Sequence, residues 1–464
     1  MKMINKKFIH WMIWFMYSII MIAYIVSSIW GEKYLYMDGS LTTYRLLTEG
    51  TFIIYPQGRR NFDIISQMFA VFGYWLGCDQ FKILACLYGF GLTGMTALVA
   101  GVTLFIAQRR DKLELGLIAL SITTIQIIFM GHYIIVESLF GVTVFLQEVV
   151  LYLVHQDDRS VCAILEYVLI IFHLFFTIHL MEYYCLWAPL LILILLYRVF
   201  LCKGASELNK WWLSVAGWQG YITWRSYIDI EARGEAPGFN TLWKEIWQRN
   251  YYVYICFLIG LVAVITLIWA LFLADKFRSG ILLLAIIHVS LFGSLIRLTV
   301  EETDRLVINS STLRWTNIPW GILGAVFLLL IFISYRSPQT DRRWFLSSYS
   351  VLLCILCIGT VCYEKVSGER QRDYHAQIVA YCDLVHRDEG FVDLLDTDFC
   401  KEPLRNYSNF WVTSYQCMDL FVLKDKSKIT TVLYNSQKGE QMNQIETYKE
   451  IEKYGLQLEL PEKE

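Results

Sequence analysis

The stretch that follows the first long apolar segment carries side chains that could perform chemistry. Asp38, next to Gly39, could act as a general base toward a hydroxyl group or hold a divalent cation such as Mg²⁺ or Mn²⁺. Arg59 and Arg60 follow in the same stretch, and Arg305 lies far downstream. Because planar guanidinium groups bind phosphate oxygens bidentately, these three arginines are candidate phosphate ligands. The alternative is that Arg59 and Arg60 contact only lipid headgroups.

Two short turns between apolar segments each carry a histidine and an acid. His132 and Glu137 flank one turn, and His179 and Glu182 flank the other. Acids and histidines beside lipid cost free energy unless a polar cavity solvates them. We therefore expect these four residues to line one substrate-binding cleft together with Asp38 and the arginines. The alternative is that the turns are polar because they face water.

These side chains depend for their positions on a set of predicted membrane-spanning helices. The 464 residues are 56% hydrophobic and 16% aromatic, which is too apolar for a soluble protein of this length. Runs of roughly 17–25 apolar residues, enough to cross a hydrocarbon core, recur along the chain. The predicted spans are 8–30, 82–107, 115–130, 137–154, 161–178, 181–197, 211–228, 251–274, 280–298, 319–335 and 344–363. The predicted fold class is an all-α polytopic membrane protein with about eleven transmembrane helices.

The weakest of these spans, 211–228, is required by the distribution of positive charge. When this span is included, the connections on the same side of the membrane as the N-terminus hold 15 Lys and Arg in 46 residues. The connections on the opposite side hold 9 in 101. Lys and Arg concentrate in the cytoplasmic loops of membrane proteins. The sequence thus predicts a multi-pass cell-membrane protein with a cytoplasmic N-terminus and an extracytoplasmic C-terminus. The net charge of −2 makes no case for a nucleic-acid partner.

The composition changes near residue 365, and this change predicts two domains. Residues 1–365 form the expected transmembrane domain, and residues 366–464 form an expected small extracytoplasmic α+β domain. Within the second domain, a short amphipathic helix is expected at 375–386 and strands at 409–425 and 428–435. The cysteine spacing is not that of a zinc site, so no residues are assigned as metal ligands.

Ionisable residues also fall inside the predicted spans. Glu166 and His173 are two helical turns apart and share a face, and Glu148 lies in the preceding span. Such residues either form a path for protons or ions or make hydrogen bonds between helices. We favour the second interpretation, because the three lie toward the inner or middle part of their spans.

Small residues recur at helical spacing in the stretch 89–101, GFGLTGMTALVAG. A glycine-rich phosphate loop would end in Lys-Ser or Lys-Thr and would precede a helix rather than lie within a span. The stretch is therefore predicted to be a helix-packing face.

The first predicted outer stretch resembles a known group of enzymes. Residues 37–60, MDGSLTTYRLLTEGTFIIYPQGRR, look like the first extracytoplasmic loop of bacterial GT-C superfamily glycosyltransferases, which use polyprenyl-phosphate-linked sugars. Residues 301–315, EETDRLVINSSTLRW, resemble the late outer loop that in relatives supplies an arginine for the lipid phosphate, here Arg305. In the common pattern a second acid accompanies the catalytic aspartate, whereas Gly39 follows Asp38 here.

The resemblance implies a GT-C-like fold and an integral membrane glycosyltransferase. Asp38 would deprotonate an acceptor hydroxyl, which attacks the anomeric carbon, and arginines would neutralise the departing lipid phosphate, normally with inversion. The implied partners are a lipid-linked sugar donor, membrane lipid and a glycan or other cell-envelope acceptor. Two other interpretations stay open: a transporter or flippase of lipid-linked saccharides, which would show internal pseudo-symmetry, and a non-catalytic membrane scaffold, which would tolerate replacement of Asp38.

Overall fold

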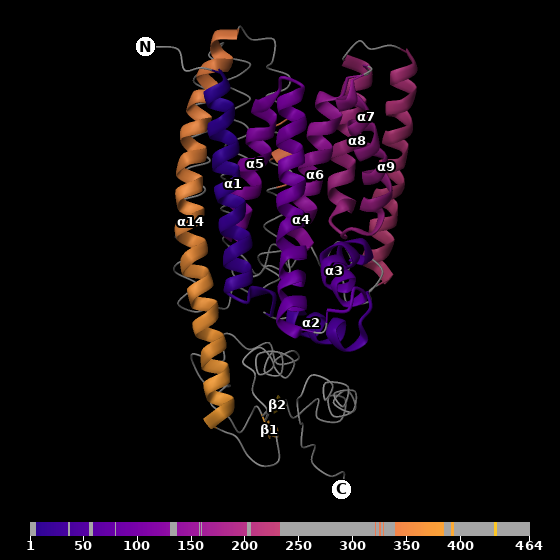
Figure 1. Cartoon of the computed structure of the whole chain (residues 1–464). Helices are drawn as coiled ribbons and strands as arrows, with labels where there is room; N and C mark the ends of the chain where they lie inside the picture. Colours follow the sequence, from indigo (N-terminus) through magenta and orange to yellow (C-terminus); the bar gives the residue numbers. More distant parts are fainter. Residues whose placement is uncertain are drawn as a thin grey trace, which may run out of the picture.

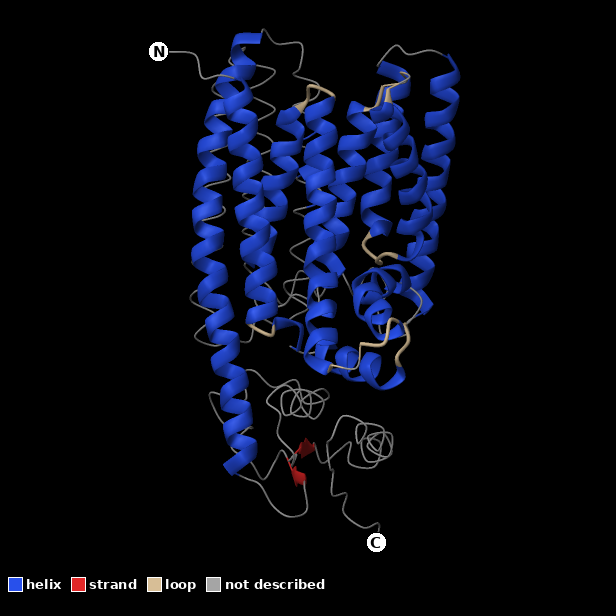
Figure 2. Cartoon of the chain, in the orientation of Figure 1, coloured by secondary structure: helices blue, strands red, loops and turns tan. Residues whose placement is uncertain are grey.

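The chain forms a bundle of long helices in a computed structural model (Figures 1 and 2). The residues that the structure describes are 6–35, 38–54, 59–78, 80–129, 137–156, 158, 160–201, 206–232, 321, 324, 325, 328, 339–384, 391–393 and 431–433.

The long helices of the described part stand side by side. They are α1 (Lys6–Trp30), α4 (Phe81–Arg109), α5 (Leu113–Phe129), α6 (Glu137–Val154), α7 (Val161–Phe176), α8 (Tyr184–Leu201), α9 (Ser206–Ala232) and α14 (Gln339–Leu384). Helix α1 packs against α14, α8 packs against α9, and α4 lies in the middle, where it contacts α1, α5 and α6. The first and last described helices are therefore neighbours at one side of the bundle (Figure 1).

Short elements gather at the end of the bundle where α1 ends. They are η1 (Lys33–Leu35), α2 (Asp38–Glu49) and α3 (Arg60–Trp75), and η3 (Thr177–His179) contacts α3 from the end of α7. Helices α2 and α3 lie across this end, at the lower end of the helix bundle in Figure 1. We call it the α2 end, and we call the opposite end, where α4 finishes and α7 begins, the Arg110 end.

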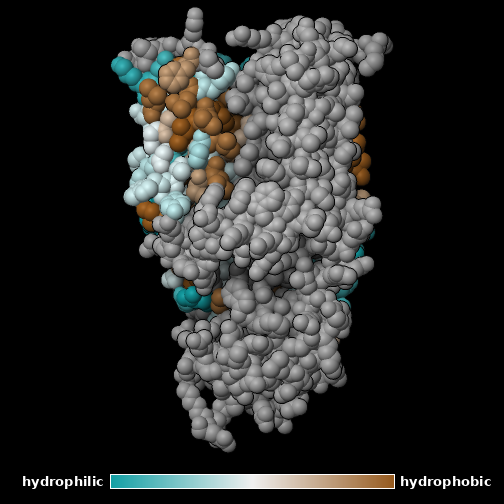
Figure 3. Space-filling model, turned by 180° about the vertical axis from the view of Figure 1, so that it is seen from behind, coloured by the Kyte–Doolittle hydropathy of each residue, from teal (hydrophilic) through white to brown (hydrophobic). Residues whose placement is uncertain are grey.

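Several helices have the length and composition of membrane spans. Within the described residues, four are long and apolar enough to cross a membrane (Lys7–Trp30, Phe81–Arg109, Val161–His179 and Tyr349–Ala380), and three more are shorter apolar helices. Large apolar side chains are exposed on them, such as Trp11 at 62% and Phe175 at 61%. Brown, apolar side chains also gather on the described surface seen from behind (Figure 3). The chain is thus built as a helical membrane protein.

Six predicted spans (8–30, 82–107, 115–130, 137–154, 161–178 and 181–197) correspond closely to six of these helices. The predicted span 211–228 lies within α9, which is not one of the helices apolar enough to cross a membrane. The predicted span nearest the C-terminus differs in extent. The predicted span 344–363 and the predicted amphipathic helix at 375–386 belong to one continuous helix, α14, of 46 residues. At 1.5 Å per residue, α14 is roughly 69 Å long, about twice the thickness of a hydrocarbon core. The expected domain boundary at 365/366 therefore falls inside a helix.

Other predictions fall at or beyond the limits of the described residues. Strand β2 (Thr431–Leu433) lies within the predicted strand 428–435 and pairs in parallel with β1 (Phe391–Asp393). The predicted strand 409–425, the spans 251–274 and 280–298, and most of the span 319–335 lie outside the described residues. The expected count of eleven spans and the expected extracytoplasmic domain stay predictions.

The stretch 89–101 of α4 is a helix-packing face, as predicted. A Cβ atom on Gly91 would collide with the backbone carbonyl of Ser66 in α3, and one on Gly101 would lie 2.5 Å from the Tyr17 hydroxyl of α1. Small residues at these positions let neighbouring helix backbones approach closely, which is how helices associate within membranes.

A buried ion pair fastens α14 to the segment between α1 and α2. Lys33 Nζ lies 2.6 Å from Glu364 Oε2, and both side chains are almost fully buried. The Ser27 hydroxyl donates to the Glu364 carbonyl oxygen, and a Cβ atom on Gly31 would lie only 2.9 Å from the Gly368 Cα. This close contact fixes where the chain leaves α1 and enters α2.

Candidate functional site

An ion pair at the α2 end joins two distant stretches of sequence. Arg59, just before α3, places its Nε 3.1 Å from Oε1 and 3.4 Å from Oε2 of Glu182, in the turn that leads into α8. The two side chains are only 20% and 9% exposed, so solvent and salt screen the attraction less than at an open surface. The first connecting stretch and the α7–α8 turn therefore meet, as the predicted cleft requires.

A second charged contact lies three residues earlier in the same turn. His179 Nδ1 is 3.2 Å from Asp229 Oδ2, and Arg225 Nη2 is 3.0 Å from Asp229 Oδ1. Asp229 is nearly buried near the end of α9, so the arginine on the same helix supplies its counter-charge. The carboxylate in turn sets the orientation of the His179 ring. We call Arg59, His179, Glu182, Arg225 and Asp229 the α2-end cluster.

Helix α3 is anchored on the end of α7, and this contact positions Arg59. Asn61 Nδ2 donates to the Phe176 carbonyl oxygen over 2.7 Å, at the last residue of α7, where carbonyl groups lack a partner within the helix. The rings of Phe62 and Phe176 both pack on Phe140 of α6, with centroid distances of 5.8 and 6.2 Å. Polar and apolar contacts thus fix the position of the start of α3 along the bundle axis.

The segment that carries Asp38 is attached to the same helix. Asp38 is the first residue of α2, where the helix dipole favours a negative side chain. After α2, Gly50 takes a left-handed conformation (φ 66°), and a Cβ atom there would collide with the Tyr74 ring of α3. Gln67 then both donates to and accepts from the backbone of Ile53 over 2.8 Å. Helices α2 and α3 therefore form one connected unit.

The structure brings two of the predicted site residues, Arg59 and Glu182, into contact, and His179 lies three positions before Glu182 in the same turn. Arg60 begins α3 with an exposed side chain, while Asp38 and Glu137 are the first residues of α2 and α6. The side chains of Asp38 and Glu137, and the whole of His132 and Arg305, lie outside what the structure describes. That all of these residues line one cleft stays a prediction.

Two members of the cluster, Arg225 and Asp229, were not among the predicted site residues. Their signal in the sequence is an Arg and an Asp four residues apart, a spacing that forms ion pairs along a helix. Sequence reasoning expected Arg225 to reach outward from the weak span 211–228, which is part of the longer helix α9. Only the fold shows that Asp229 faces the α7–α8 turn.

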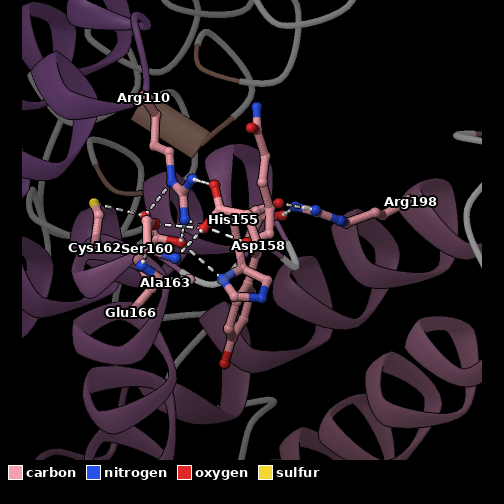
Figure 4. Close-up of polar contacts among 10 residues, drawn as sticks. Arg110, His155, Asp158, Ser160, Cys162, Ala163, Glu166 and Arg198 are labelled. Atoms are coloured by element: carbon pink, nitrogen blue, oxygen red, sulfur yellow. Dashed lines mark hydrogen bonds and ion pairs between the residues drawn. The ribbon is translucent and has the colours of Figure 1, made fainter.

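A different charged network lies at the Arg110 end of the bundle (Figure 4). The Arg110 guanidinium donates to Glu166 of α7 through Nε (2.5 Å) and Nη2 (2.8 Å) and to Asp158 through Nη1 (2.6 Å). His155 Nδ1 lies 2.7 Å from the same Glu166 carboxylate, which is fully buried. Glu166 thus bonds neighbouring segments to one another, in line with the interpretation favoured from the sequence.

The network extends to α8 and α9 through Arg198. Its guanidinium donates to the carbonyl oxygens of Tyr152 and His155, where α6 ends, and lies 4.7 Å from the centroid of the Trp212 ring. A cation over an indole face is attracted by the ring quadrupole. Arg110 and Arg198 together therefore tie the ends of α4, α6 and α8 to the first two turns of α7 and α9.

His173 is likewise bonded to another helix. Its Nε2 lies 2.8 Å from Gln147 Oε1 of α6, and Gln147 Nε2 donates to the Val99 carbonyl oxygen of α4 over 3.1 Å. These contacts connect three helices within the bundle, so the interhelical interpretation is confirmed for His173 as well.

The Arg110 network predicts a specific loss of stability in acid. The pKa of the Asp158 carboxyl is lowered from 3.8 to about 2, chiefly because Arg110 donates to it and then because Ser160 does. A lowered pKa stabilises the folded state above the unfolded pKa, and this contribution is lost as the pH falls from about 4 toward 2. The melting temperature of the detergent-solubilised protein should fall less steeply over that range in Asp158→Asn than in the wild type. Parallel pH profiles would contradict this assignment.

The described residues give no direct support for a metal centre. Among them, no group of three or more His, Cys, Asp or Glu side chains is placed to hold a metal ion. The divalent cation considered for Asp38 stays a prediction, because the position of that side chain is not described.

No family model, curated protein or solved structure matches this chain.

Proposed function

We propose that the protein is an integral membrane glycosyltransferase that moves a sugar from a polyprenyl-phosphate donor to a hydroxyl group of a cell-envelope acceptor. The observation that supports this proposal most is the ion pair between Arg59 and Glu182. It holds a guanidinium at the end of a membrane bundle, at the level where a lipid phosphate would lie, and on the stretch that begins with Asp38. A carboxyl group and a guanidinium on one rigid unit suit general-base catalysis and phosphate binding.

The proposed reaction proceeds by direct displacement at the anomeric carbon. The acceptor hydroxyl loses its proton to the Asp38 carboxylate as its oxygen forms a bond to that carbon. The bond from the carbon to the phosphate oxygen breaks, and the lipid phosphate leaves with the electron pair. Arg59 stabilises the charge that develops on the phosphate, since preorganised cationic donors act most strongly where charge appears. His179, held by Asp229, would bind hydroxyl groups of a sugar.

The proposed orientation places this chemistry outside the cell. The α2 end would be extracytoplasmic and the Arg110 end cytoplasmic, in agreement with the excess of Lys and Arg in the connections on the N-terminal side. A lipid-linked donor fits this placement, because it carries its activated sugar within the membrane, whereas nucleotide sugars are cytosolic.

A pair of variants in the α2-end cluster tests phosphate binding. Arg59→Gln should raise the level of the lipid-linked sugar in cells and lower its incorporation into surface polymer by roughly 10–100-fold, because a charge-assisted hydrogen bond contributes about 1.5–3 kcal/mol. Glu182→Gln breaks the same ion pair but keeps the guanidinium, so it should retain most of the incorporation. Extracted polyprenyl-phosphate sugars would be quantified by mass spectrometry in a deletion strain complemented with each variant.

Arg45→Gln is the matched control, because Arg45 is 43% exposed and pairs with Glu49 one turn later on the same helix. It should behave as the wild type. Two results would overturn the proposal: a deletion strain with an unchanged pool of every lipid-linked sugar, or equal losses in Arg59→Gln and Glu182→Gln, which would indicate that the ion pair is structural.

A further inference from the structure

Glu148 is a fully buried acid within α6, six residues before the helix ends. Its carboxyl oxygens accept hydrogen bonds from the Tyr184 hydroxyl of α8 (2.9 Å), from Gln219 Nε2 of α9 (3.1 Å) and from the Tyr152 hydroxyl of α6 (3.4 Å). All of these donors are neutral. The group therefore joins three helices but receives no positive charge from its partners.

The other buried acids with known partners differ in this respect. Glu166 is bonded to Arg110, Glu364 to Lys33, and both pairs are almost fully buried. Among the residues that the structure describes, no Lys, Arg or His lies within ion-pair distance of Glu148. An ionised carboxylate in such surroundings costs several kcal/mol without a counter-charge. Glu148 consequently needs a positive ion on its own oxygens.

A second buried oxygen beside Glu148 also lacks a partner. Gln219 donates through Nε2 to both Glu148 and the Tyr152 hydroxyl (2.9 Å), while its Oε1 is fully buried and, within the described part of the chain, accepts no hydrogen bond. A buried acceptor of this kind costs free energy unless something occupies it. Rotation about the last side-chain torsion turns Oε1 toward the carboxyl group. The site then offers two carboxyl oxygens, one amide oxygen and two phenolic oxygens.

We propose that Glu148, Tyr152, Tyr184 and Gln219 form an exchangeable monovalent-cation site, occupied by a proton or by Na⁺. Oxygen ligands with a single negative charge suit a singly charged, hard cation. With a proton bound, Glu148 is a neutral carboxylic acid. When Na⁺ enters, the proton leaves and the charge of the site is unchanged. This site is distinct from the proposed transferase reaction and does not depend on it, although Tyr184 is only two positions after Glu182.

Carbodiimide labelling tests the site in native membranes, with dicyclohexylcarbodiimide as the probe. The O–H of a neutral carboxylic acid adds across a C=N bond of this apolar reagent, and the acyl group then moves to nitrogen and leaves a stable N-acylurea. No oxidant or reductant takes part. Peptide mass spectrometry should find the adduct on Glu148 in the wild type and lose it in Glu148→Gln. Glu166 is the internal control, because it is equally buried but paired with Arg110.

Comparing the labelling rate in NaCl with that in choline chloride distinguishes bound Na⁺ from a bound proton. If Na⁺ binds, NaCl at roughly ten times its dissociation constant should slow labelling about tenfold relative to choline chloride, by mass action. Gln219→Leu should then weaken this protection while labelling in choline chloride persists. Labelling that is indifferent to Na⁺ identifies the proton as the occupant.

Infrared difference spectroscopy in sodium-free buffer covers the case in which the reagent does not reach the site. Subtraction of the Glu148→Gln spectrum from the wild-type spectrum should show the carbonyl stretch of one protonated carboxyl group. The proposal is overturned if neither the adduct nor this band is found, or if Glu166 is labelled as strongly as Glu148. A fold check by size-exclusion chromatography accompanies each variant.

Discussion

Replacing Asp38 by asparagine should lower the rate of sugar transfer by roughly 10²–10⁴-fold, the usual contribution of a positioned general base. The amide cannot accept the proton of the acceptor hydroxyl, whereas the size of the side chain is kept. Since Asp38 is the first residue of α2, asparagine also preserves a polar residue suited to the start of a helix. The loss should therefore appear in catalysis with little change in protein level. The measurement is incorporation of labelled sugar into surface polymer at matched expression.

Glu49→Gln provides the control at the other end of α2. Glu49 is 42% exposed and pairs with Arg45 one turn earlier, a contact worth only a few tenths of a kcal/mol. Glu49→Gln likewise replaces a carboxylate by its amide on the same helix, so a general effect of charge on α2 would appear in both variants. Incorporation by Asp38→Asn within a few-fold of wild type would rule out the general-base role and favour the scaffold interpretation.

Replacing Arg110 by methionine should reduce the free energy of unfolding by about 3–5 kcal/mol, the typical result of removing one partner of a buried ion pair. The substitution removes the bidentate partner of the fully buried Glu166 carboxylate. It also removes the ion pair between Arg110 and Asp158. Because this network ties α4 to α7, the bundle should separate at the Arg110 end first. Thermal unfolding in detergent and the rate of proteolysis near 155–160 would measure the effect.

Arg109→Met is the matched control, because Arg109 is the adjacent residue, has an exposed side chain and lies over the Phe105 ring at 5.2 Å. Its effect should stay below about 1 kcal/mol. Combining Arg110→Met with Glu166→Leu should recover part of the lost stability, since the unpaired buried charge is then removed as well. A double variant less stable than Arg110→Met alone would argue against the pairing as the source of the loss.

The described helices could largely be predicted from the sequence, because each reflects a local property. The apolar runs 82–107, 137–154 and 161–178 reappear as α4, α6 and α7 with shifts of a few residues. In lipid, a long apolar run can satisfy its backbone only as a helix, which leaves few alternatives. Helices α2 and α3 were not predicted, because they lie across the end of the bundle and depend on contacts with α4 and α7 rather than on apolar length.

The candidate site could be predicted only in part, and the reason is again physical. The amino-acid pattern alone indicates a helical membrane protein, with Arg59, His179 and Glu182 in or beside the connections between apolar segments and Glu148, Glu166 and His173 within those segments. Which residues form hydrogen bonds or ion pairs with these side chains depends on how the helices pack, which the sequence pattern does not show.

Two glutamates, each inside a predicted apolar span, illustrate how the partners differ. Glu166 is bonded to Arg110, 56 residues away, whereas the described partners of Glu148 are two tyrosines and a glutamine. Likewise, nothing local to Glu182 indicates that Arg59, 123 residues earlier, supplies its counter-charge. Helix formation depends on neighbours in sequence, but the charge state and role of a buried acid depend on which helices pack around it, and only the folded bundle decides that.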